Sequence, residues 1–464
     1  MRSIPSRGIS VAALAAAALT FAAASCRADL DEYVKQPDPA YEWKRLDSQD
    51  TLLGKVSNLE LTSQVWQGIT WKHNLRVYES GKSAHDDAVL LFITGGSTGK
   101  KPGPDMDLLC LTLSKLAGAR VALLSQVPNQ PLLDGKKEDD LIAETFVKYL
   151  ETKDETWPLL FPMVKSAVRA MDAVQAWAKE ERQVDVTRFV VTGASKRGWT
   201  TWLTAEVDDR VVALAPMVIV MLNLGEQGPN QLDVWGAYSE QIDDYVRRGL
   251  MEEMQKPGPG TKLWKMVDPY TLRDRLAEKP KFLVNGANDP YWTQNALDLY
   301  WDGLPGDKHV MFLPNAGHGL DGDRSWVVNG IAAFFRSSVE GKPLPRLDWK
   351  LEPGSKDQYS LKINADPAPK SARLWTAESE TRDFRESKWV DTPLEPGAIV
   401  SALVTAPESG GKAVYADLEY EYDGLPYHLT TSFFEPGLEL KLKKEKRQAK
   451  DAAAAAPVGA AATP

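Results

Sequence analysis

Cysteine is nearly absent from this chain of 464 residues, which contains only Cys26 and Cys110. Neither belongs to a Cys/His spacing typical of a zinc site. Cys110 lies in an apolar run at residues 108–113 and is expected to be a buried thiol. If Cys26 is removed or acylated, no internal disulfide can form, so the fold must rely on its core. A hydrophobic content of 43% can build such a core, and we expect no metal and no cofactor.

Net positive charge is also lacking, because acidic residues outnumber basic ones and the formal net charge at pH 7 is −9. The chain has no extended basic stripe with interleaved aromatic residues, which would mark a nucleic-acid partner. A nucleic acid is therefore excluded, and the expected partner is a small-molecule or peptide substrate. The sequence does not indicate an oligomeric state.

The apolar stretch at the N-terminus is short for a bilayer span, which needs roughly 20 apolar residues. Arg2 and Arg7 precede this stretch at residues 9–24, and small residues follow it, as in a signal peptide. Two interpretations remain for its end. Residues 23–26 resemble a lipobox with Ala23 in place of the usual Leu, so that an acylated Cys26 would attach the protein to a membrane. Alternatively, plain cleavage occurs near Ser25. Both place the protein in the periplasm or cell envelope.

Apolar runs alternate with helical patterns over residues 51–345. The runs at 88–94, 120–125, 211–221 and 281–285 are typical of strands that are covered on both faces. The clearest helical periodicity lies between them, at residues 161–178. This alternation predicts an α/β domain with a mostly parallel sheet covered by helices. Residues 27–50 are polar, include Pro37 and Pro39, and are expected to form a tether.

Three later segments depart from the alternation. Residues 222–277 are mostly helical and rich in Trp and Tyr, and we interpret them as a cap over the site or as a peripheral insertion. Residues 346–442 carry short alternating runs with a hairpin signal at Asp423-Gly424, which predicts a small C-terminal β-sandwich. The sequence leaves the role of that domain open. Residues 443–464 are rich in Ala and are expected to be disordered.

A short β-branched run at residues 189–192 leads into Gly193-Ala-Ser-Lys-Arg-Gly198, and a helical pattern follows at once. This G-x-S-x-x-G motif resembles the nucleophile elbow, in which a serine is presented on a sharp strand-to-helix turn. Small residues suit a turn where two backbones approach closely. Ser195 is therefore the candidate nucleophile, and the N–H of Lys196 a candidate oxyanion donor. The alternative is an ordinary turn that contains a serine.

A second glycine-rich turn, Gly95-Gly-Ser-Thr-Gly99, follows the apolar run at residues 88–94. In a serine hydrolase the second oxyanion donor belongs at this position, so Gly95 and Gly96 are the candidates. The alternatives are a flexible loop or a phosphate loop without its Gly-Lys-Ser/Thr end.

Two further strands each end in a candidate catalytic side chain. Asp289 follows the strand at residues 281–285, and His318 lies between glycines after the strand at residues 309–313. The order Ser195, Asp289, His318 is that of α/β-hydrolases. A histidine is needed as general base and acid, and a carboxylate to orient it. The other four histidines lie at less suitable positions: 73, 85, 309 and 428. The rival acids are Asp268, Asp321 and Asp323.

Four segments carry a family resemblance: Gly193-Ala-Ser-Lys-Arg-Gly-Trp-Thr-Thr-Trp202, Val267-Asp-Pro-Tyr270, Asn285-Gly-Ala-Asn-Asp289 and Pro314-Asn-Ala-Gly-His318. They resemble the PhoPQ-activated pathogenicity-related protein family over most of residues 30–440. The resemblance implies an α/β-hydrolase-like fold, frequent export, and triad positions at Ser195, Asp289 and His318. It leaves the substrate open. The related secreted proliferation repressors of Dictyostelium imply a non-catalytic or peptidase-like alternative.

Basic and aromatic residues surround the candidate nucleophile. Arg197 either provides a positive field for an anionic substrate or pairs with an acid and holds the elbow. Trp199, Tyr291 and Trp292 either line a substrate pocket or belong to the core. We expect an exported serine hydrolase for an ester or amide, with an esterase favoured over a peptidase because no site for an N-terminal amine is evident. The alternative is a catalytically idle binding or signalling protein with a hydrolase fold.

Overall fold

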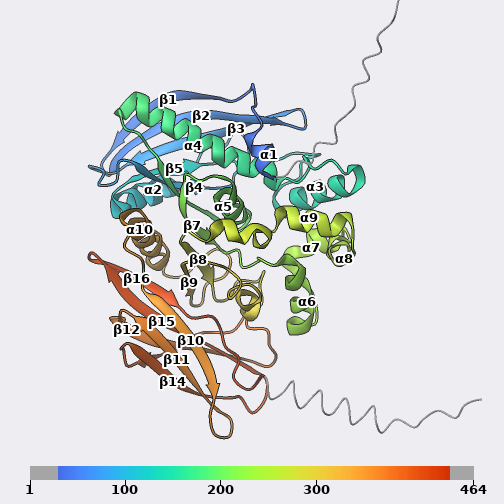
Figure 1. Cartoon of the computed structure of the whole chain (residues 1–464), viewed down its shortest axis with the longest axis vertical. Coiled ribbons are helices and arrows are strands. Elements are labelled where there is room, and N and C mark those ends of the chain that lie inside the picture. The colour runs from blue at the N-terminus through green and yellow to red at the C-terminus, as the bar shows by residue number, and fades with distance from the viewer. Residues whose placement is uncertain (1–29, 439–464) are drawn as a thin grey trace, which may run out of the picture.

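The computed structural model describes residues 30–438. The segment expected to be a signal peptide, Cys26 and the expected tail at residues 443–464 lie outside the described residues. Within the described range the chain forms a helix-covered sheet, a helical cap beside it and a pair of antiparallel sheets at the C-terminal end (Figure 1). No helix of this range is long and apolar enough to cross a membrane.

The large sheet of residues 30–438 has nine strands in the order β1-β2-β3-β5-β4-β6-β7-β8-β9. Their bounds are β1 (Glu42–Thr51), β2 (Gly54–Trp66), β3 (Ile69–Glu79), β4 (Ala88–Ile93), β5 (Arg120–Leu124), β6 (Arg188–Ala194), β7 (Val211–Met217), β8 (Lys281–Gly286) and β9 (Lys308–Leu313). Strands β1, β2, β3 and β5 pair antiparallel, whereas all pairs from β5 to β9 are parallel. The mostly parallel sheet predicted from the apolar runs is therefore confirmed.

The chain order reverses at β4, which has β5 on one side and β6 on the other. In an open parallel sheet such a switch point leaves a crevice at the carboxyl ends of the strands, because the two connections leave in opposite directions. The glycine-rich turn follows β4 and the serine turn follows β6. Topology alone thus places both at the same crevice.

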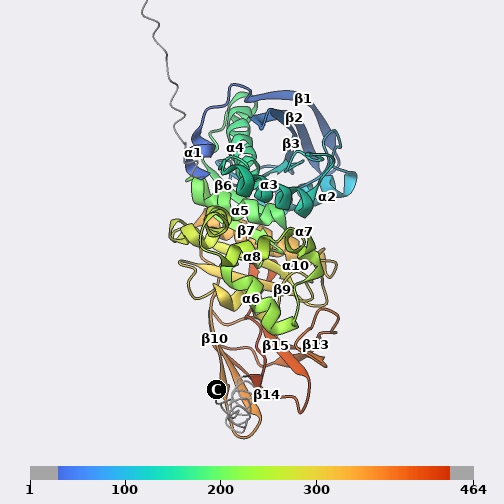
Figure 2. The ribbon, with the colours of Figure 1, turned by 90° about the vertical axis from the view of Figure 1, so that its right-hand side faces the viewer.

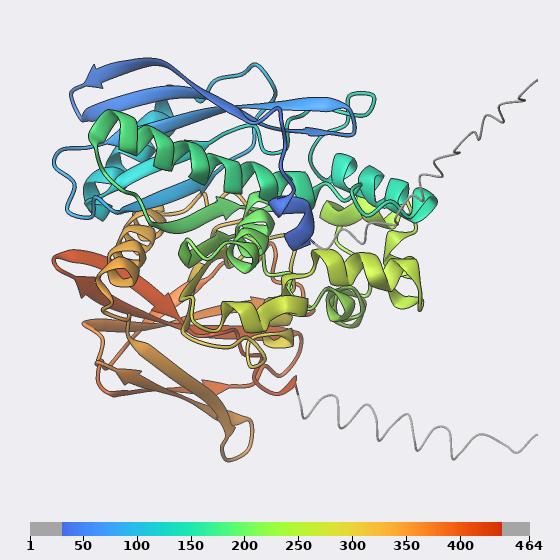
Figure 3. The same cartoon turned by 45° about the horizontal axis from the view of Figure 1, so that its top comes forward.

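Helices cover both faces of this sheet (Figure 3). On one face lie α1 (Leu30–Lys35), α4 (Leu160–Arg182) and α5 (Lys196–Val207), and on the other α2 (Pro104–Ala117) and α10 (Arg324–Glu340). In α4 the apolar side chains recur every three to four residues, and a buried stripe from Phe161 to Trp177 results. Burial on both faces explains why β4 and β5 are apolar at every position but Arg120.

The segment between β7 and β8 forms the cap, which faces the viewer in Figure 2. It consists of α6 (Leu224–Trp235), η1 (Glu240–Ile242), α7 (Asp243–Val246), α8 (Leu250–Gln255), α9 (Pro259–Val267) and η2 (Pro269–Leu276). Helix α3 (Glu138–Thr152) packs against α7, α8 and α9. The half-buried carboxylate of Asp268 accepts the backbone N–H groups of Asn223, Leu224 and Tyr270, so it fastens both ends of the cap.

The C-terminal strands form two antiparallel sheets below the large sheet in Figure 1. One contains β10 (Arg346–Pro353), β11 (Gln358–Asp366) and β14 (Ile399–Thr405), and the other β12 (Ser371–Ser379), β13 (Val390–Leu394), β15 (Gly411–Tyr422) and β16 (Leu425–Thr430). The inward side chains of both sheets share one buried cluster. The predicted hairpin at Asp423-Gly424 joins β15 to β16, and both residues have positive φ, as a tight hairpin turn requires.

The N-terminal segment differs from the tether expected for residues 27–50. Residues 30–35 form α1, which packs on α4, and residues 42–51 form β1 at the edge of the large sheet. Most β1 side chains are exposed, so the strand lacks the apolar alternation that identifies a strand in a sequence. The strand is held in place by backbone hydrogen bonds to β2. Polar side chains do not prevent such bonds.

Candidate active site

Ser195 occupies the turn between β6 and α5 with φ of +60° and ψ of −124°. This left-handed φ is rare for residues other than glycine and is a strained conformation. A Cβ on Gly193 would lie 2.7 Å from the carbonyl oxygen of Arg197, and one on Gly198 would lie 2.6 Å from a methyl group of Ile219. The small residues of the motif are therefore required by close packing, as an elbow demands.

Three side chains from the ends of β6, β8 and β9 form one hydrogen-bonded row. Ser195 Oγ lies 2.9 Å from His318 Nε2, and His318 Nδ1 lies 2.8 Å from Asp289 Oδ2. The other carboxylate oxygen of Asp289 accepts the backbone N–H of Tyr291 at 3.0 Å. Asp289 is only 4% exposed, whereas the His318 side chain keeps 25% of its surface accessible. A nucleophile, a base and a buried orienting carboxylate require this arrangement.

The three rival acids are placed elsewhere. Asp268 accepts backbone N–H groups of the cap, and burial raises its pKa to about 6 against the opposing effect of these bonds. Asp323 caps α10 through the N–H of Ser325. Asp321 lies 3.9 Å from Arg324 at the exposed start of the same helix. None of the three bonds to His318.

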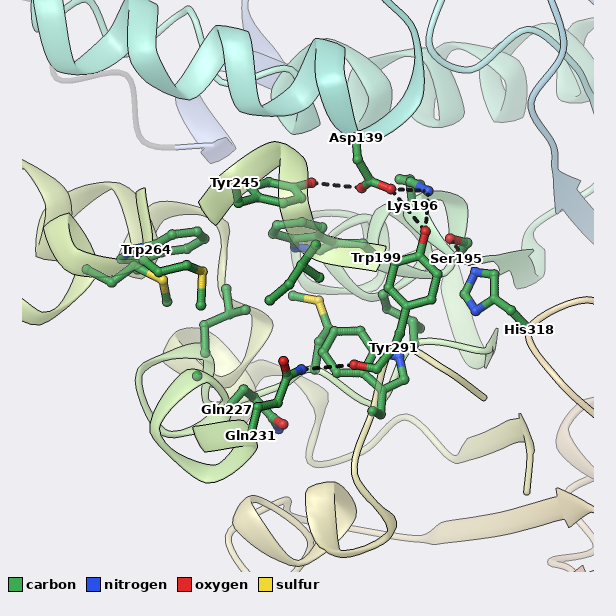
Figure 4. Close-up of a pocket in the computed structure, with 18 residues that line it drawn as sticks. Asp139, Ser195, Lys196, Trp199, Gln227, Gln231, Tyr245, Trp264, Tyr291 and His318 are labelled. Atoms are coloured by element: carbon green, nitrogen blue, oxygen red, sulfur yellow. Dashed lines mark hydrogen bonds and ion pairs between the residues drawn. The ribbon is translucent and has the colours of Figure 1, made fainter. Parts of the chain in front are cut away.

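A partly buried polar cluster lies beside the row and centres on Asp139, the second residue of α3. Its carboxylate accepts hydrogen bonds from Tyr245 at 2.9 Å and from Tyr291 at 3.1 Å, and it lies 2.6 Å from Lys196 Nζ. Figure 4 shows these groups converging next to Ser195 and His318. Burial and the neighbouring Asp139 raise the pKa of the Tyr291 hydroxyl, which therefore remains a donor. The positive charge of Lys196 is thus compensated by the carboxylate of Asp139.

Arg197 pairs with an acidic residue, one of the two possibilities that the sequence left open. Its guanidinium binds Glu138 through two hydrogen bonds of 2.6 and 2.8 Å and donates to the carbonyl of Val127. Burial opposes ionisation of Glu138, but the bonds and charge of Arg197 lower the pKa of this carboxyl to about 2. A Cβ on Gly95 would lie 2.4 Å from the guanidinium, so Gly95 is the surface on which Arg197 packs. Arg197 does not line the pocket at Ser195, which favours pairing with an acid over contact with a substrate.

The candidate oxyanion donors surround the turn but remain a prediction. The N–H of Lys196 belongs to the first residue of α5, where helix geometry provides no acceptor. Gly95 and Gly96 follow β4, the neighbour of β6, and Gly96 has a φ of +106° with open space where a Cβ would lie. Neither glycine lines the pocket beside Ser195.

An apolar cavity of about 80 Å³ opens beside Ser195 and His318. By the same measure one water needs roughly 10–15 Å³, so the cavity has room for an apolar group of several carbon atoms. The cap provides much of its wall, and Figure 4 shows Trp264 at the end remote from His318. The apolar and aromatic side chains that line it are Trp199, Ile219, Met221, Leu224, Ile242, Tyr245, Met251, Met254, Trp264, Tyr291 and Trp292.

Of the candidate substrate residues, Trp199, Tyr291 and Trp292 therefore face this cavity, although the indole of Trp199 also donates to the carbonyl of Val267. Asp139 was not among the residues predicted from the sequence. The acidic run Glu138-Asp139-Asp140 at the start of a helical pattern was the available signal, but acids are common in the first turn of any helix.

Two comparisons with known proteins point to one family. A model of the PhoPQ-activated pathogenicity-related protein family matches residues 30–385. Autocrine proliferation repressor protein A of Dictyostelium discoideum is 30% identical over 441 residues, which covers 85% of this chain and 86% of that protein. The chain has the α/β-hydrolase fold, as predicted, with antiparallel sheets added at the C-terminal end.

Two solved structures are more distant. The acetyl xylan esterase of Paenibacillus sp. R4 is 12% identical with a TM-score of 0.44, over 62% of this chain and 86% of that chain. Acetyl xylan esterase 1 of Thermoanaerobacterium sp. JW/SL YS485 is 18% identical with a TM-score of 0.44, over 63% of this chain and 89% of that chain.

Proposed function

Because the chain belongs to the PhoPQ-activated pathogenicity-related protein family and aligns Ser195, His318 and Asp289 in one row, we propose that it is an exported serine hydrolase. The observation that carries the proposal is the pair of contacts at His318, 2.9 Å to Ser195 Oγ and 2.8 Å to Asp289 Oδ2. Export is supported by the N-terminal sequence pattern. Attachment through an acylated Cys26 is one form of that export.

The proposed reaction uses this geometry in two stages, acylation and deacylation. Ser195 Oγ attacks the carbonyl carbon while His318 Nε2 takes its proton, and Asp289 holds the imidazole in the tautomer that can accept it. The oxyanion is stabilised by the N–H of Lys196 and by an N–H from the turn at Gly95 and Gly96. His318 then returns the proton to the leaving group, and an acyl-enzyme remains. Water activated by the same imidazole releases the acid and restores the serine.

The cavity favours an apolar acyl group. After attack the acyl carbon is bonded to Ser195 Oγ, so the acyl chain must enter the cavity that Ser195 lines. The surface that its walls expose is mostly apolar, and such a surface stabilises a hydrocarbon by roughly 0.8 kcal/mol per buried CH₂. Esters or amides of short to medium-length apolar acids fit this description.

An ester is favoured over a peptide with a free N-terminus. Capture of an amine in the cavity requires an unpaired carboxylate, and Asp139 is the carboxylate that lines it. That group already binds Lys196 and two tyrosine hydroxyls. Displacing the buried lysine would leave a charge uncompensated, at a cost of several kcal/mol.

The test is labelling with a fluorophosphonate probe, which reacts with an activated serine. We expect Ser195 to be modified and Ser195→Ala, with an unchanged melting temperature, to be unreactive. A panel of acyl esters, uronate esters and aminoacyl amides then decides the substrate class. A folded protein that neither labels nor turns over any member of the panel would be a binding or signalling protein, and the proposal would fail.

A further inference from the structure

A second, open cavity meets the row from the side of the C-terminal domain. This groove of about 490 Å³ is lined by His318 and by both loops that carry the row, at Asn288 and Asn315. Its remaining wall is the loop between β12 and β13, residues 385–388. Ser195 does not line it. His318 therefore lies between a small apolar cavity and an open polar groove.

The loop is fixed in this position. Asn288 Nδ2 donates to the carbonyls of Phe384, Arg385 and Ser387 at 3.2, 3.1 and 2.7 Å. Asn315 exchanges two hydrogen bonds with the backbone of Trp389, at 3.0 and 2.8 Å. Both asparagines belong to the loops that carry Asp289 and His318, so the second domain is fastened directly to the catalytic loops.

The cap holds the same loop from its other side. Arg385 pairs with Glu240 of the cap at 2.9 Å, and its guanidinium lies 4.3 Å from the ring centre of Trp235. It also binds Asp383 within its own loop. Three parts of the chain thus build this wall.

We propose that residues 385–388 form the leaving-group subsite of the hydrolase and that the leaving group is a hydroxyl-rich alcohol. This inference rests on the proposed function. In acylation His318 donates its proton to the leaving oxygen, so the rest of the alcohol must extend along the cavity that His318 lines but Ser195 does not. The groove meets this condition. Its open form accommodates an alcohol much larger than the acyl group.

The free groups of the wall indicate the chemistry of the alcohol. Arg385, the amide nitrogen of Asn288 and Asn315 are engaged in the contacts above, and Asn288 Oδ1 is buried. Glu386 and Lys388 are exposed and have no ion pair within residues 30–438. They offer one acceptor and one donor of opposite charge, two residues apart. Such a pair complements hydroxyl groups, which both donate and accept. A leaving group with a single charge would be attracted by one of the two and repelled by the other, and would therefore gain less.

Four butyrate esters test the inference: those of methanol, methyl glucoside, choline and lactate. We expect kcat/KM for the glucoside ester to exceed that for the methyl ester at least tenfold, and the choline and lactate esters to gain less. The double variant Glu386→Ala/Lys388→Ala should lower the ratio of glucoside to methyl ester about tenfold, as for the loss of a charged hydrogen bond. Lys350→Ala, an exposed lysine on β10, is the matched control and should leave the ratio unchanged.

The double variant should also affect only one step of the reaction, acylation. The alcohol has departed before deacylation, so the loss is expected in the burst-phase acylation rate and not in the deacylation rate. A ratio unaltered by the double variant, or a preference for the choline or lactate ester, overturns the subsite. Absence of fluorophosphonate labelling at Ser195 would instead overturn the proposed function, so the two failures are distinguishable.

Discussion

The ring of Tyr291 lies against the imidazole of His318, with centroids 4.3 Å apart and planes inclined by 32°. The backbone N–H of Tyr291 binds Asp289, and its hydroxyl donates to Asp139. One residue is therefore attached to the orienting carboxylate, covers the base and joins both to the polar cluster of α3. We infer that Tyr291 is a positioning residue for His318.

Removal of this ring should reduce turnover more than removal of its hydroxyl. We expect Tyr291→Ala to lower kcat about 100-fold, the loss typical of a misplaced catalytic group, and Tyr291→Phe to lower it less than tenfold because the ring contact remains. Steady-state kinetics on one ester separates the two. Equal losses in both variants would show that the hydroxyl, and not the ring, holds His318.

Asp289→Asn tests the orienting carboxylate. The amide retains the size of the side chain but favours the wrong histidine tautomer, so kcat should fall about 10⁴-fold with little change in the melting temperature. Retention of more than a tenth of the wild-type kcat would show that another group orients His318.

The apolar cavity should determine which lengths of acyl chain the protein accepts. Met251 of the cap lines it, and Met251→Trp fills part of the space. We expect kcat/KM for a hexanoyl ester to fall at least tenfold relative to the acetyl ester, because a few methylene groups no longer fit. An unchanged ratio would place the acyl chain outside this cavity. The acetyl ester, measured on the same variant, is the internal control.

The elbow should tolerate no extra methyl group. A Cβ at Gly193 would lie within 3 Å of carbonyl oxygens from Arg197 and Ile93, and overpacking of this kind costs about 1–3 kcal/mol. We expect Gly193→Ala to lower the melting temperature and the labelling rate. Gly225 in α6 has nothing within 4 Å of its Cβ position, so Gly225→Ala should be neutral or slightly stabilising. Similar melting temperatures for the two variants would contradict the close packing.

Glu206 on α5 should make stability depend on pH. It is 6% exposed, and neither carboxyl oxygen has a hydrogen-bond partner among the described residues. Burial, followed by the charge of Asp268, raises its pKa well above the ordinary value. Asp31 acts in the same direction, and Arg275 and Lys279 oppose it.

The folded protein therefore binds this proton more tightly than the unfolded chain does. Stability contributed by protonated Glu206 is present below pH 4.5 and is lost as the pH rises towards the folded pKa. Glu206→Gln should remove this loss and be more stable than the wild type at pH 8 by at least about 1 kcal/mol, with a smaller difference at pH 4.5. Urea unfolding at both pH values measures it. A variant less stable at pH 8 would contradict the assignment.

The parts of the site that sequence analysis predicted all follow buried parallel strands. Ser195, Asp289 and His318 each come directly after an apolar run, and the edge of a parallel sheet gathers such positions whatever the distance between them in sequence. The fold class was predictable for the same reason. Strand β1 was not predictable, because its side chains are mostly polar and exposed and show no apolar alternation.

Asp139 and the loop at residues 385–388 were not predictable either. Asp139 acquires its role from two tyrosines and a lysine that lie 57 to 152 positions away. The loop meets His318 only because the second domain folds back onto Asn288 and Asn315. Neither relationship produces a local sequence pattern, because both depend on the tertiary packing of segments that are far apart in the chain.

Asn288 stands next to Asp289 in sequence, and its side chain donates to three carbonyls of the C-terminal domain. The C-terminal domain therefore supports the loop that carries Asp289, although it contains no residue of the Ser-His-Asp row. A protein shortened before Arg346 would retain every residue of the Ser-His-Asp row and lose the support of the loop that carries its acid. The antiparallel sheets must therefore stay together with the hydrolase domain to which they are attached, both in an engineered chimera and in natural recombination.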